Sequence, residues 1–412
     1  MEKIYLDNQS NTKIDIRVFE AMYPFFLENY GNPQSIYSLG SISKEAVEKA
    51  RTQAANLINA QTSEIIFTSC GTESNNLALK GLAKVSKSKG RRILISSVEH
   101  ISVLNSAKQL EKDGFEVIYI PVDSKGFVDQ DILEKSLTKD VILVSIQYAN
   151  PEIGTIQNIK ELTSIVKKNS SALFHTDAVS ACGVIPVDVK ELGVDALSFS
   201  SSVMYGPKGV AALFLKQSVK IESLLSGGIQ ENSRRSGTEN VPAIVGFGKA
   251  CEVAVQELDS NLKHLKNLSS KLIEELPKRI EHIYLNGPFE NRLPGNINFS
   301  VEFVEGEALF LLLDAKGIMA ASGSACANKN LKISTVLSAI NTDVALGQGS
   351  ILFTLSKFNT QEEMDFVLEE FPKIILRLRD MSPLYSHFLK TGQRKAAGPG
   401  TDFDDHDYCE IE

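Results

Sequence analysis

The sequence has no apolar segment long enough to cross a membrane. Its apolar runs, such as residues 308–313, are far shorter than the roughly 18–20 residues of a membrane-spanning helix. Residues 1–7 also lack the basic stretch followed by an apolar one that is typical of a secretory signal. We therefore predict a cytoplasmic protein without a membrane partner.

The chain also lacks paired cysteines and a strongly basic surface. Its five cysteines are odd in number and widely spaced, with no C-x-x-C motif, which excludes a disulfide framework and predicts no metal site. Cys70 and Cys182 fall in or beside predicted core elements, so we expect both to be buried. Six of the 51 acidic residues lie in the last twelve, and the first 400 residues carry 43 basic and 45 acidic side chains. This near-neutral body disfavours nucleic acid as a partner.

What is present in the 412 residues is an alternation of short apolar strands and helical patterns. This alternation predicts an α/β fold: a mainly parallel seven-stranded sheet with helices on both faces, and a smaller α+β domain. We place the large domain at 12–257, the small domain at 1–11 and 258–390, and an acidic flexible tail at 391–412. Leucines from Leu258 to Leu276 predict a long helix between the domains that ends near Pro277. The predicted strands are 64–68, 92–95, 117–120, 141–146, 172–176, 196–199 and 210–214.

Three short motifs follow predicted strands. Gly71 and Thr72 stand in a small-residue turn at a helix start, where backbone N–H groups suit a phosphate. Asp177 ends a buried strand, and His100 follows another. Taken singly, these residues are equally compatible with a plain turn, a helix cap and a surface histidine.

Three later segments make the motifs interpretable together. Residues 198–209 (SFSSSVMYGPKG), 235–240 (RSGTEN) and 321–326 (ASGSAC) resemble, in that order, the cofactor-lysine segment, the intersubunit loop and the catalytic-cysteine loop of the cysteine desulfurases. These are class V aminotransferases, which are pyridoxal-phosphate enzymes. Residues 4–7 and 30–33 also match, so the resemblance covers about residues 1–390 and implies an aspartate-aminotransferase-like fold.

The resemblance assigns roles to individual residues. Asp177 matches the partner of the pyridine nitrogen, and His100 matches the histidine stacked on the ring. Cys326 matches the cysteine that takes sulfur as a persulfide when L-cysteine is converted to L-alanine. The remaining cofactor-binding candidates are Gly71, Thr72, Ser200, Ser202 and, across a dimer interface, Thr238.

The sequence departs from the family pattern at the reacting atoms. The lysine that forms the Schiff base falls on Val203, and the histidine before it falls on Ser202. The arginine for the substrate carboxylate falls on Leu352. We therefore predict a catalytically inactive or strongly impaired protein that forms no covalent link to pyridoxal phosphate, although non-covalent binding stays open. Three further departures are Pro151 for an asparagine, Ser180 for a glutamine and Tyr37 for a histidine.

Two alternatives remain open at this point. The protein could be an active sulfur-transfer enzyme that uses Cys326 as a persulfide relay or binds pyridoxal phosphate non-covalently. It could also be a module that binds a phosphate ligand or a partner. The resemblance implies a homodimer, allows a heterodimer with an active relative, and suggests an iron–sulfur scaffold or sulfur-acceptor protein as partner.

Overall fold

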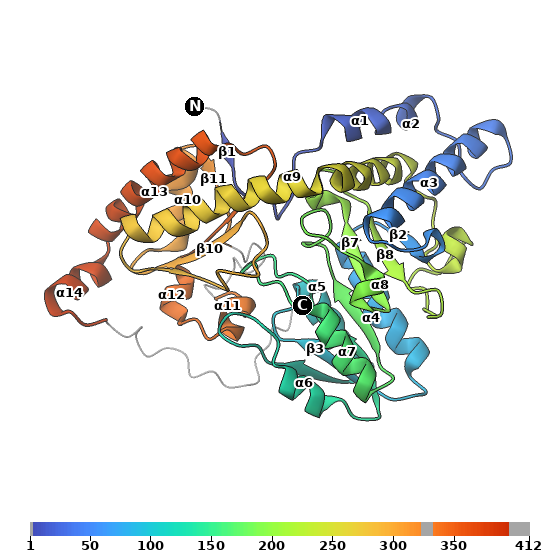
Figure 1. Cartoon of the computed structure of the whole chain (residues 1–412), viewed down its shortest axis with the longest axis horizontal. Helices are drawn as coiled ribbons and strands as arrows, with labels where there is room; N and C mark the ends of the chain where they lie inside the picture. The colour runs from blue at the N-terminus through green and yellow to red at the C-terminus, as the bar shows by residue number, and fades with distance from the viewer. Residues whose placement is uncertain (1–2, 323–332, 395–412) are drawn as a thin grey trace.

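All seven segments predicted as strands form one sheet in the computed structural model, which describes residues 3–322 and 333–394 (Figure 1). The strand order is β2-β8-β7-β6-β5-β3-β4. β8 runs antiparallel to both neighbours, β2 and β7, and the other pairs are parallel. The connection from β7 to β8 contains only the short 3₁₀ turn η2, so the chain reverses direction there. The predicted fold class is confirmed. The strands are β2 (Ile65–Thr68), β3 (Arg92–Ser96), β4 (Glu116–Ile120), β5 (Val141–Ser145), β6 (Leu173–Asp177), β7 (Ala196–Ser200) and β8 (Ala211–Leu215).

Helices cover both faces of this sheet. One apolar core joins the sheet to α3 (Ser38–Leu57), α7 (Ile159–Asn169) and the first half of α9 (Val241–Arg279). A second core joins the other face to α4 (Gly71–Ser86) and α5 (Ile101–Lys112). The shorter helices are α1 (Ile16–Met22), α2 (Pro24–Leu27), α6 (Gln130–Ser136), α8 (Val189–Leu192) and the 3₁₀ turns η1 (Thr62–Glu64), η2 (Ser201–Val203) and η3 (Gln230–Ser233).

A smaller α+β unit packs on the second half of α9. Its antiparallel sheet has the order β12-β10-β9, and β1 (Ile4–Tyr5) pairs in parallel with β11 (Ile318–Met319). A separate apolar core joins these strands to α9, α10 and α13. The unit contains β9 (Ile283–Leu285), β10 (Asn296–Val301), β12 (Ser350–Thr354), α10 (Gly306–Ala315), α11 (Thr335–Ala339), α12 (Val344–Gln348), α13 (Gln361–Asp380) and α14 (Pro383–Thr391).

The helix α9 is longer than the leucine pattern predicts. It begins at Val241, with Asn240 as its cap, and continues through Pro277 to Arg279. The first half contains small residues that pack closely on other helices: a Cβ added to Gly248 would lie 2.5 Å from the Cα of Ala50 in α3. Small residues at a close helix contact leave no leucine repeat, so the sequence pattern misses this half.

Two predictions on cysteines have different outcomes. Cys182 is buried, as predicted, but Cys70 is exposed because it is the extended residue between the end of β2 and the start of α4. Cys326 and the acidic segment 395–412 lie outside the described residues. Within the described ranges, no helix has the length and apolarity to span a membrane, and no cluster of three or more His, Cys, Asp or Glu side chains could bind a metal.

Candidate functional site

Most of the predicted site residues lie at one edge of the large sheet, where its parallel strands end. Asp177 is the last residue of β6, and Ser200 is the last residue of β7. His100 follows β3 as the N-cap of α5. Gly71 opens α4 after β2, and a Cβ added there would lie 2.8 Å from Val179 and 3.9 Å from Ser200. The fold therefore brings these separate motifs together, as expected for ligand sites of α/β sheets.

A continuous chain of hydrogen bonds joins His100 to Asp177. The Nδ2 of Asn75 donates to Asp177 Oδ2 at 2.7 Å and to Ser102 Oγ at 2.9 Å. Ser102 in turn contacts His100 Nδ1 through its hydroxyl at 2.7 Å and its backbone N–H at 3.2 Å. Because an N–H points at Nδ1, that nitrogen is the acceptor, and the proton of the neutral ring is on Nε2.

Asn75 and Ser102 were not among the predicted site residues, although Asn75 lies within the helix-start motif. Asp177 is 3% exposed, and its Oδ1 accepts from the N–H of Val179 at 3.0 Å. Its two oxygens are therefore held in a fixed direction by donors. The Oδ1 of Asn75 is buried and has no hydrogen-bond partner within 3–322 and 333–394, as expected for a wall of a ligand site.

Glu99 and His175 are two further buried titratable groups close to His100 and Asp177 in the sequence. Glu99 accepts from Ser96 Oγ and the N–H of Gln147, both at 2.6 Å. Burial raises the pKa of Glu99 to about 8, and the negative charge of Asp177 acts in the same direction. His175 contacts Ser145 and Ser198, and burial lowers its pKa to about 3. Asp177 thus has a neutral histidine and a protonated glutamic acid near it around pH 7.

The turn after β7 places Val203 at the site. Val203 is 9% exposed and lines a cavity of about 40 Å³ together with Gln9, Ser180 and Thr354. Ser202 contacts Ser200 Oγ to Oγ at 3.2 Å. Valine has no amine, so this position cannot link covalently to an aldehyde. The nearest lysine in sequence, Lys208, is exposed.

The structure also shows where the other residues that depart from the family pattern lie. Leu352 is 4% exposed in β12, and Tyr37 is exposed beside α3. Pro151 follows Asn150, whose Nδ2 donates to the carbonyl of Val98 just before Glu99 and His100. Leu352 supplies no charge for a substrate carboxylate.

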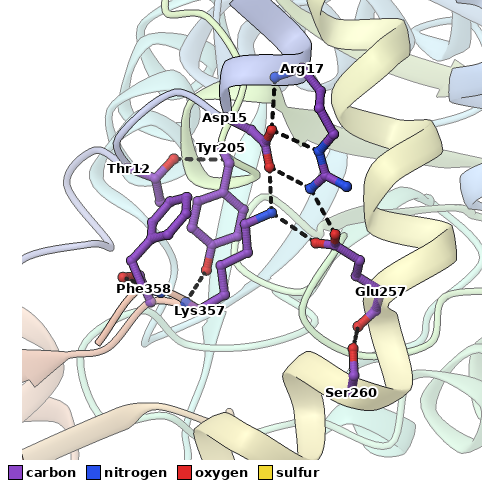
Figure 2. A network of polar contacts seen from close by, with 9 residues as sticks. Thr12, Asp15, Arg17, Tyr205, Glu257, Ser260, Lys357 and Phe358 are labelled. Carbon is purple, nitrogen blue, oxygen red and sulfur yellow. Dashed lines mark hydrogen bonds and ion pairs between the residues drawn. The ribbon is translucent and has the colours of Figure 1, made fainter. Parts of the chain in front are cut away.

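An ion-pair network holds the Val203 turn against the smaller unit (Figure 2). The Nζ of Lys357 contacts Asp15 at 2.6 Å and Glu257 at 2.8 Å, and Arg17 contacts the same two carboxylates. The cations beside Asp15 hold its pKa well below its usual range. Three chain segments, which contain Asp15 with Arg17, Glu257, and Lys357, are therefore fixed to one another by charge.

Tyr205, two residues after Val203, is the aromatic part of this network. Its N–H donates to Thr12 Oγ1, and its hydroxyl accepts from the N–H of Lys357, both at 2.9 Å. The Lys357 ammonium lies 4.8 Å from the centre of the ring. Tyr205 has φ of 58°, a left-handed conformation that these contacts enforce.

Thr238 is not joined to the group around Asp177 by any contact within the described part of the chain. It is exposed on the loop between η3 and α9. Two ion pairs fix η3 and this loop to helices α3 and α4: Glu231 accepts two bonds from Arg51, at 2.6 and 2.8 Å, and Arg235 donates to Glu73 at 2.8 Å. An exposed Thr238 on a fixed loop is compatible with its predicted role in a neighbouring subunit.

These residues fit pyridoxal phosphate held without a covalent link. The first N–H groups of α4, at Gly71 and Thr72, have no carbonyl one turn earlier in the helix and suit the phosphate. Asp177 and His100 are held in place for a pyridine ring. The unpartnered Asn75 Oδ1 and the opening kept by Gly71 are the structural observations in favour of a ligand here.

Comparisons with known proteins point to one family. The aminotransferase class-V model matches residues 4–367. A protein of Dictyoglomus turgidum named cysteine desulfurase IscS is 50% identical over 381 residues, which cover 92% of this chain and 96% of that relative. The human protein named cysteine desulfurase is 42% identical over 388 residues, covering 93% of this chain and 84% of its own.

Solved structures agree with these relatives. A NifS-like protein superposes with a TM-score of 0.86 at 40% identity, covering 91% of this chain and 100% of its own. The NifS-like protein of Rickettsia africae gives a TM-score of 0.82 at 32% identity, covering 90% and 99%.

These identities support an active sulfur-transfer enzyme better than the loss of activity predicted from Val203 and Leu352. They also imply pyridoxal phosphate as the cofactor. The chain belongs to the class-V aminotransferases and, within them, to the cysteine desulfurase family.

Proposed function

We propose that the protein is a sulfur-transfer enzyme that converts L-cysteine to L-alanine, with Cys326 as sulfur acceptor and with pyridoxal phosphate held non-covalently. In this reaction the carbon–sulfur bond of cysteine breaks and the sulfur joins a thiol, which becomes a persulfide. The observation that carries the proposal is the intact hydrogen-bond chain from His100 to Asp177, in a protein whose position 203 carries no amine.

Pyridoxal phosphate, when bound, supplies an electron sink for bonds at the α-carbon of an amino acid. The chain would hold it through the N–H groups of Gly71 and Thr72, the hydroxyls of Ser200 and Ser202, and the ring contact of His100. The Asp177 carboxylate would keep a proton on the pyridine nitrogen, because a buried anion stabilises the cation beside it.

The absence of an amine at position 203 sets the expected rate. In a family member with lysine at this position, that residue both links to the cofactor and moves a proton. A positioned general base typically accelerates a reaction by about 10²–10⁴. We therefore propose a slow enzyme whose substrate carboxylate is also held less firmly, because Leu352 carries no charge.

We further propose a homodimer in which Thr238 of one subunit reaches the site of the other. Exposed apolar residues on and beside α1 and α2 favour a subunit contact there; they are Ile16, Phe19, Tyr23, Phe26 and Leu27, at 47–64% exposure. A mixed dimer with an active relative would use the same surface. The persulfide would supply sulfur to an acceptor protein in iron–sulfur cluster assembly.

The test combines a spectrum with product analysis. The purified chain is incubated with pyridoxal phosphate, desalted, and examined by visible absorption, borohydride reduction and peptide mapping. We expect retained cofactor without a lysine adduct, slow release of alanine from L-cysteine, and a persulfide on Cys326 that the Cys326→Ser variant lacks.

Two results would contradict the proposal. A chain that retains no cofactor and releases no alanine is not an enzyme of this kind. A borohydride-stable adduct on Lys208 would instead show a covalent site that the exposed position of this lysine does not suggest.

A further inference from the structure

Glu152, in the loop between β5 and α7, is a buried residue that the proposed reaction does not use. Its backbone is fixed on both sides: the N–H donates to Asn150 Oδ1 at 2.9 Å, and the carbonyl accepts from Asn298 Nδ2 at 3.0 Å. Asn298 lies in β10 of the smaller unit. Glu152 is therefore held where a loop of the large domain meets the small sheet, and these backbone bonds do not depend on its side chain.

The side chain of Glu152 makes one hydrogen bond, which goes to the start of α11. Ser334 Oγ donates to Glu152 Oε2 at 2.6 Å, joining residues 182 positions apart. The same hydroxyl accepts from the N–H of Val336 at 3.1 Å and from that of Leu337 at 3.4 Å, as the N-cap of the helix. A hydroxyl has a single proton, so the bond to Glu152 sets the direction in which Ser334 offers its lone pairs to α11.

An apolar contact attaches α11 to the same region. Side chains of the helix and its C-cap pack with two loops of the large domain in a small separate core, which consists of Val98, Ile153, Val336, Leu337 and Ile340. Val98 lies two residues before His100, and Ile153 directly follows Glu152. The start of α11 is therefore attached to two loops of the large domain, one of which leads directly to His100.

The carboxyl group of Glu152 is costly to the fold. Glu152 is 5% exposed, and burial raises its pKa to about 7. Its Oε1 is buried and has no hydrogen-bond partner among the residues that the structure describes. A buried carboxyl with a single hydrogen bond costs free energy that an apolar side chain of similar size does not. What the carboxyl contributes is the position of Ser334.

The chain just before Ser334 contains Cys326. Residues 323–332, which include this cysteine, lie outside the described residues, but the chain on either side of them is described. On one side, the N–H of Leu352 donates to the Ala321 carbonyl at 2.8 Å, and the N–H of Ala321 donates to the Leu352 carbonyl at 3.2 Å. On the other side stands Ser334. Both ends of the segment that carries Cys326 are therefore tied to the body of the protein.

We propose that Glu152 is a positioning residue for Cys326 and acts through Ser334 and α11. This inference rests on the proposed function, because it assumes that Cys326 accepts sulfur. Glu152 itself neither makes nor breaks a bond in the reaction. It fixes one end of the segment that carries the thiol, and a misplacement of about 1 Å is enough to slow a reaction about 10²-fold.

The experiment compares the full chain as wild type, Glu152→Ala, Ser334→Ala and the double variant, with Glu152→Gln as the conservative variant. After incubation with pyridoxal phosphate, peptide mass mapping measures the rate at which L-cysteine forms a persulfide on Cys326. The KM for L-cysteine is measured in parallel. Amide hydrogen exchange at residues 333–340 is a readout that does not depend on activity.

Ser382→Ala is the matched control. Ser382 is also the N-cap of a helix, α14, and accepts from the N–H of Tyr385 at 3.4 Å. Its hydroxyl contacts no carboxylate within 3–322 and 333–394, so this variant removes a helix cap without removing a bond to a distant segment.

We expect Glu152→Ala to slow persulfide formation about 10–100-fold with little change in KM. Exchange at residues 333–340 should become about tenfold faster, the size of one lost buried hydrogen bond. Glu152→Gln keeps an acceptor for Ser334 and should recover most of the rate. Ser334→Ala should be at least as slow as Glu152→Ala, and the double variant no slower than Ser334→Ala, because both changes remove the same bond. Ser382→Ala should keep the wild-type rate.

Three results would overturn the inference and leave the proposed function intact. Glu152→Ala could form the persulfide at the wild-type rate. The double variant could be slower than Ser334→Ala by the full factor of Glu152→Ala, which would show that Glu152 does not act through Ser334. Ser382→Ala could be as slow as Glu152→Ala, so that the loss of any helix cap suffices. If wild type itself forms no persulfide, the proposed function is wrong, and the inference is overturned with it.

Discussion

Replacing Lys357 with methionine tests whether the charge network in Figure 2 holds the Val203 turn. The Lys357 side chain is 9% exposed, and its partners Asp15 and Glu257 are 5% and 27% exposed. Methionine keeps most of the side-chain volume but removes the charge. Two carboxylates then lie close together with Arg17 as their remaining cation.

The expected loss of stability follows from this burial. Removing one partner of a buried ion pair typically costs about 3–5 kcal/mol. Arg17 still contacts both carboxylates, and Glu257 reaches solvent, so we expect a value at the lower end, about 3 kcal/mol. The loss of the cation above the Tyr205 ring is included in that figure, since such contacts contribute about 0.5–2 kcal/mol.

Urea denaturation and hydrogen exchange together measure the effect. We expect a lower denaturation midpoint and faster amide exchange at residues 201–206, because Tyr205 loses the cation beside its ring and keeps only its hydrogen bonds to the N–H of residue 357 and to Thr12. Lys373→Met is the control: Lys373 on α13 also pairs with two glutamates but is 58% exposed, so its loss should cost less than about 1 kcal/mol. Equal midpoints for the two variants, with unchanged exchange at 201–206, would refute the reasoning.

Three further variants test other parts of the structure. Val203→Lys supplies the missing amine, so we expect alanine release from L-cysteine to rise about 10²–10⁴-fold and borohydride to trap pyridoxal phosphate on residue 203. An unchanged rate would show that the missing amine at position 203 does not limit the activity. Ser233 is exposed with φ of 63°, so Ser233→Gly should raise the free energy of unfolding by about 0.5–1 kcal/mol in urea, whereas a loss would show an unrecognised contact. Burial raises the pKa of Glu99 from its ordinary 4.5 to about 8, so between these two pH values the folded state binds a proton that the unfolded state has lost. The free energy of unfolding therefore falls as pH rises through this range, by about 1.4 kcal/mol per pH unit. Glu99→Gln should remove this part of the slope between pH 5.5 and 7.5 in thermal denaturation, and an unchanged slope would contradict the raised pKa.

The strands of the large sheet could be predicted because each is a short apolar run with its own turn signals. The reversed direction of β8 could not be predicted in the same way. It depends on the turn from Ser201 to Val210, which is too short for a helical crossover. The sequence of this segment was interpreted for its chemistry at Val203 and not for the direction of the next strand.

The same distinction applies to the candidate site: residues placed by a neighbouring strand could be predicted, whereas contacts between distant segments could not. Asp177 ends β6, and His100 and Gly71 come shortly after β3 and β2, so local sequence places them at the sheet edge. The bond from Gln9 to Ser180 and the ion pairs of Lys357 join segments more than 90 residues apart. A glutamine or lysine carries no local signal of its distant partner, so only the folded chain shows these contacts.

The helix α9 has a further consequence for how this protein tolerates change in chain length. Its 39 residues form one continuous rod of about 58 Å that packs on α3 at one end and on the small sheet at the other. Inserting a single residue between these ends would turn everything after it by about 100° and move it by about 1.5 Å. The small sheet would then face away from the site. Thr354 would be separated from Gln9, and Lys357 would be separated from Asp15. An insertion of seven residues would nearly restore the angle but would lengthen the rod by about 10 Å. The length of α9 therefore fixes both the distance and the angle between the large sheet and the small sheet. Neither a one-residue nor a seven-residue insertion would preserve both.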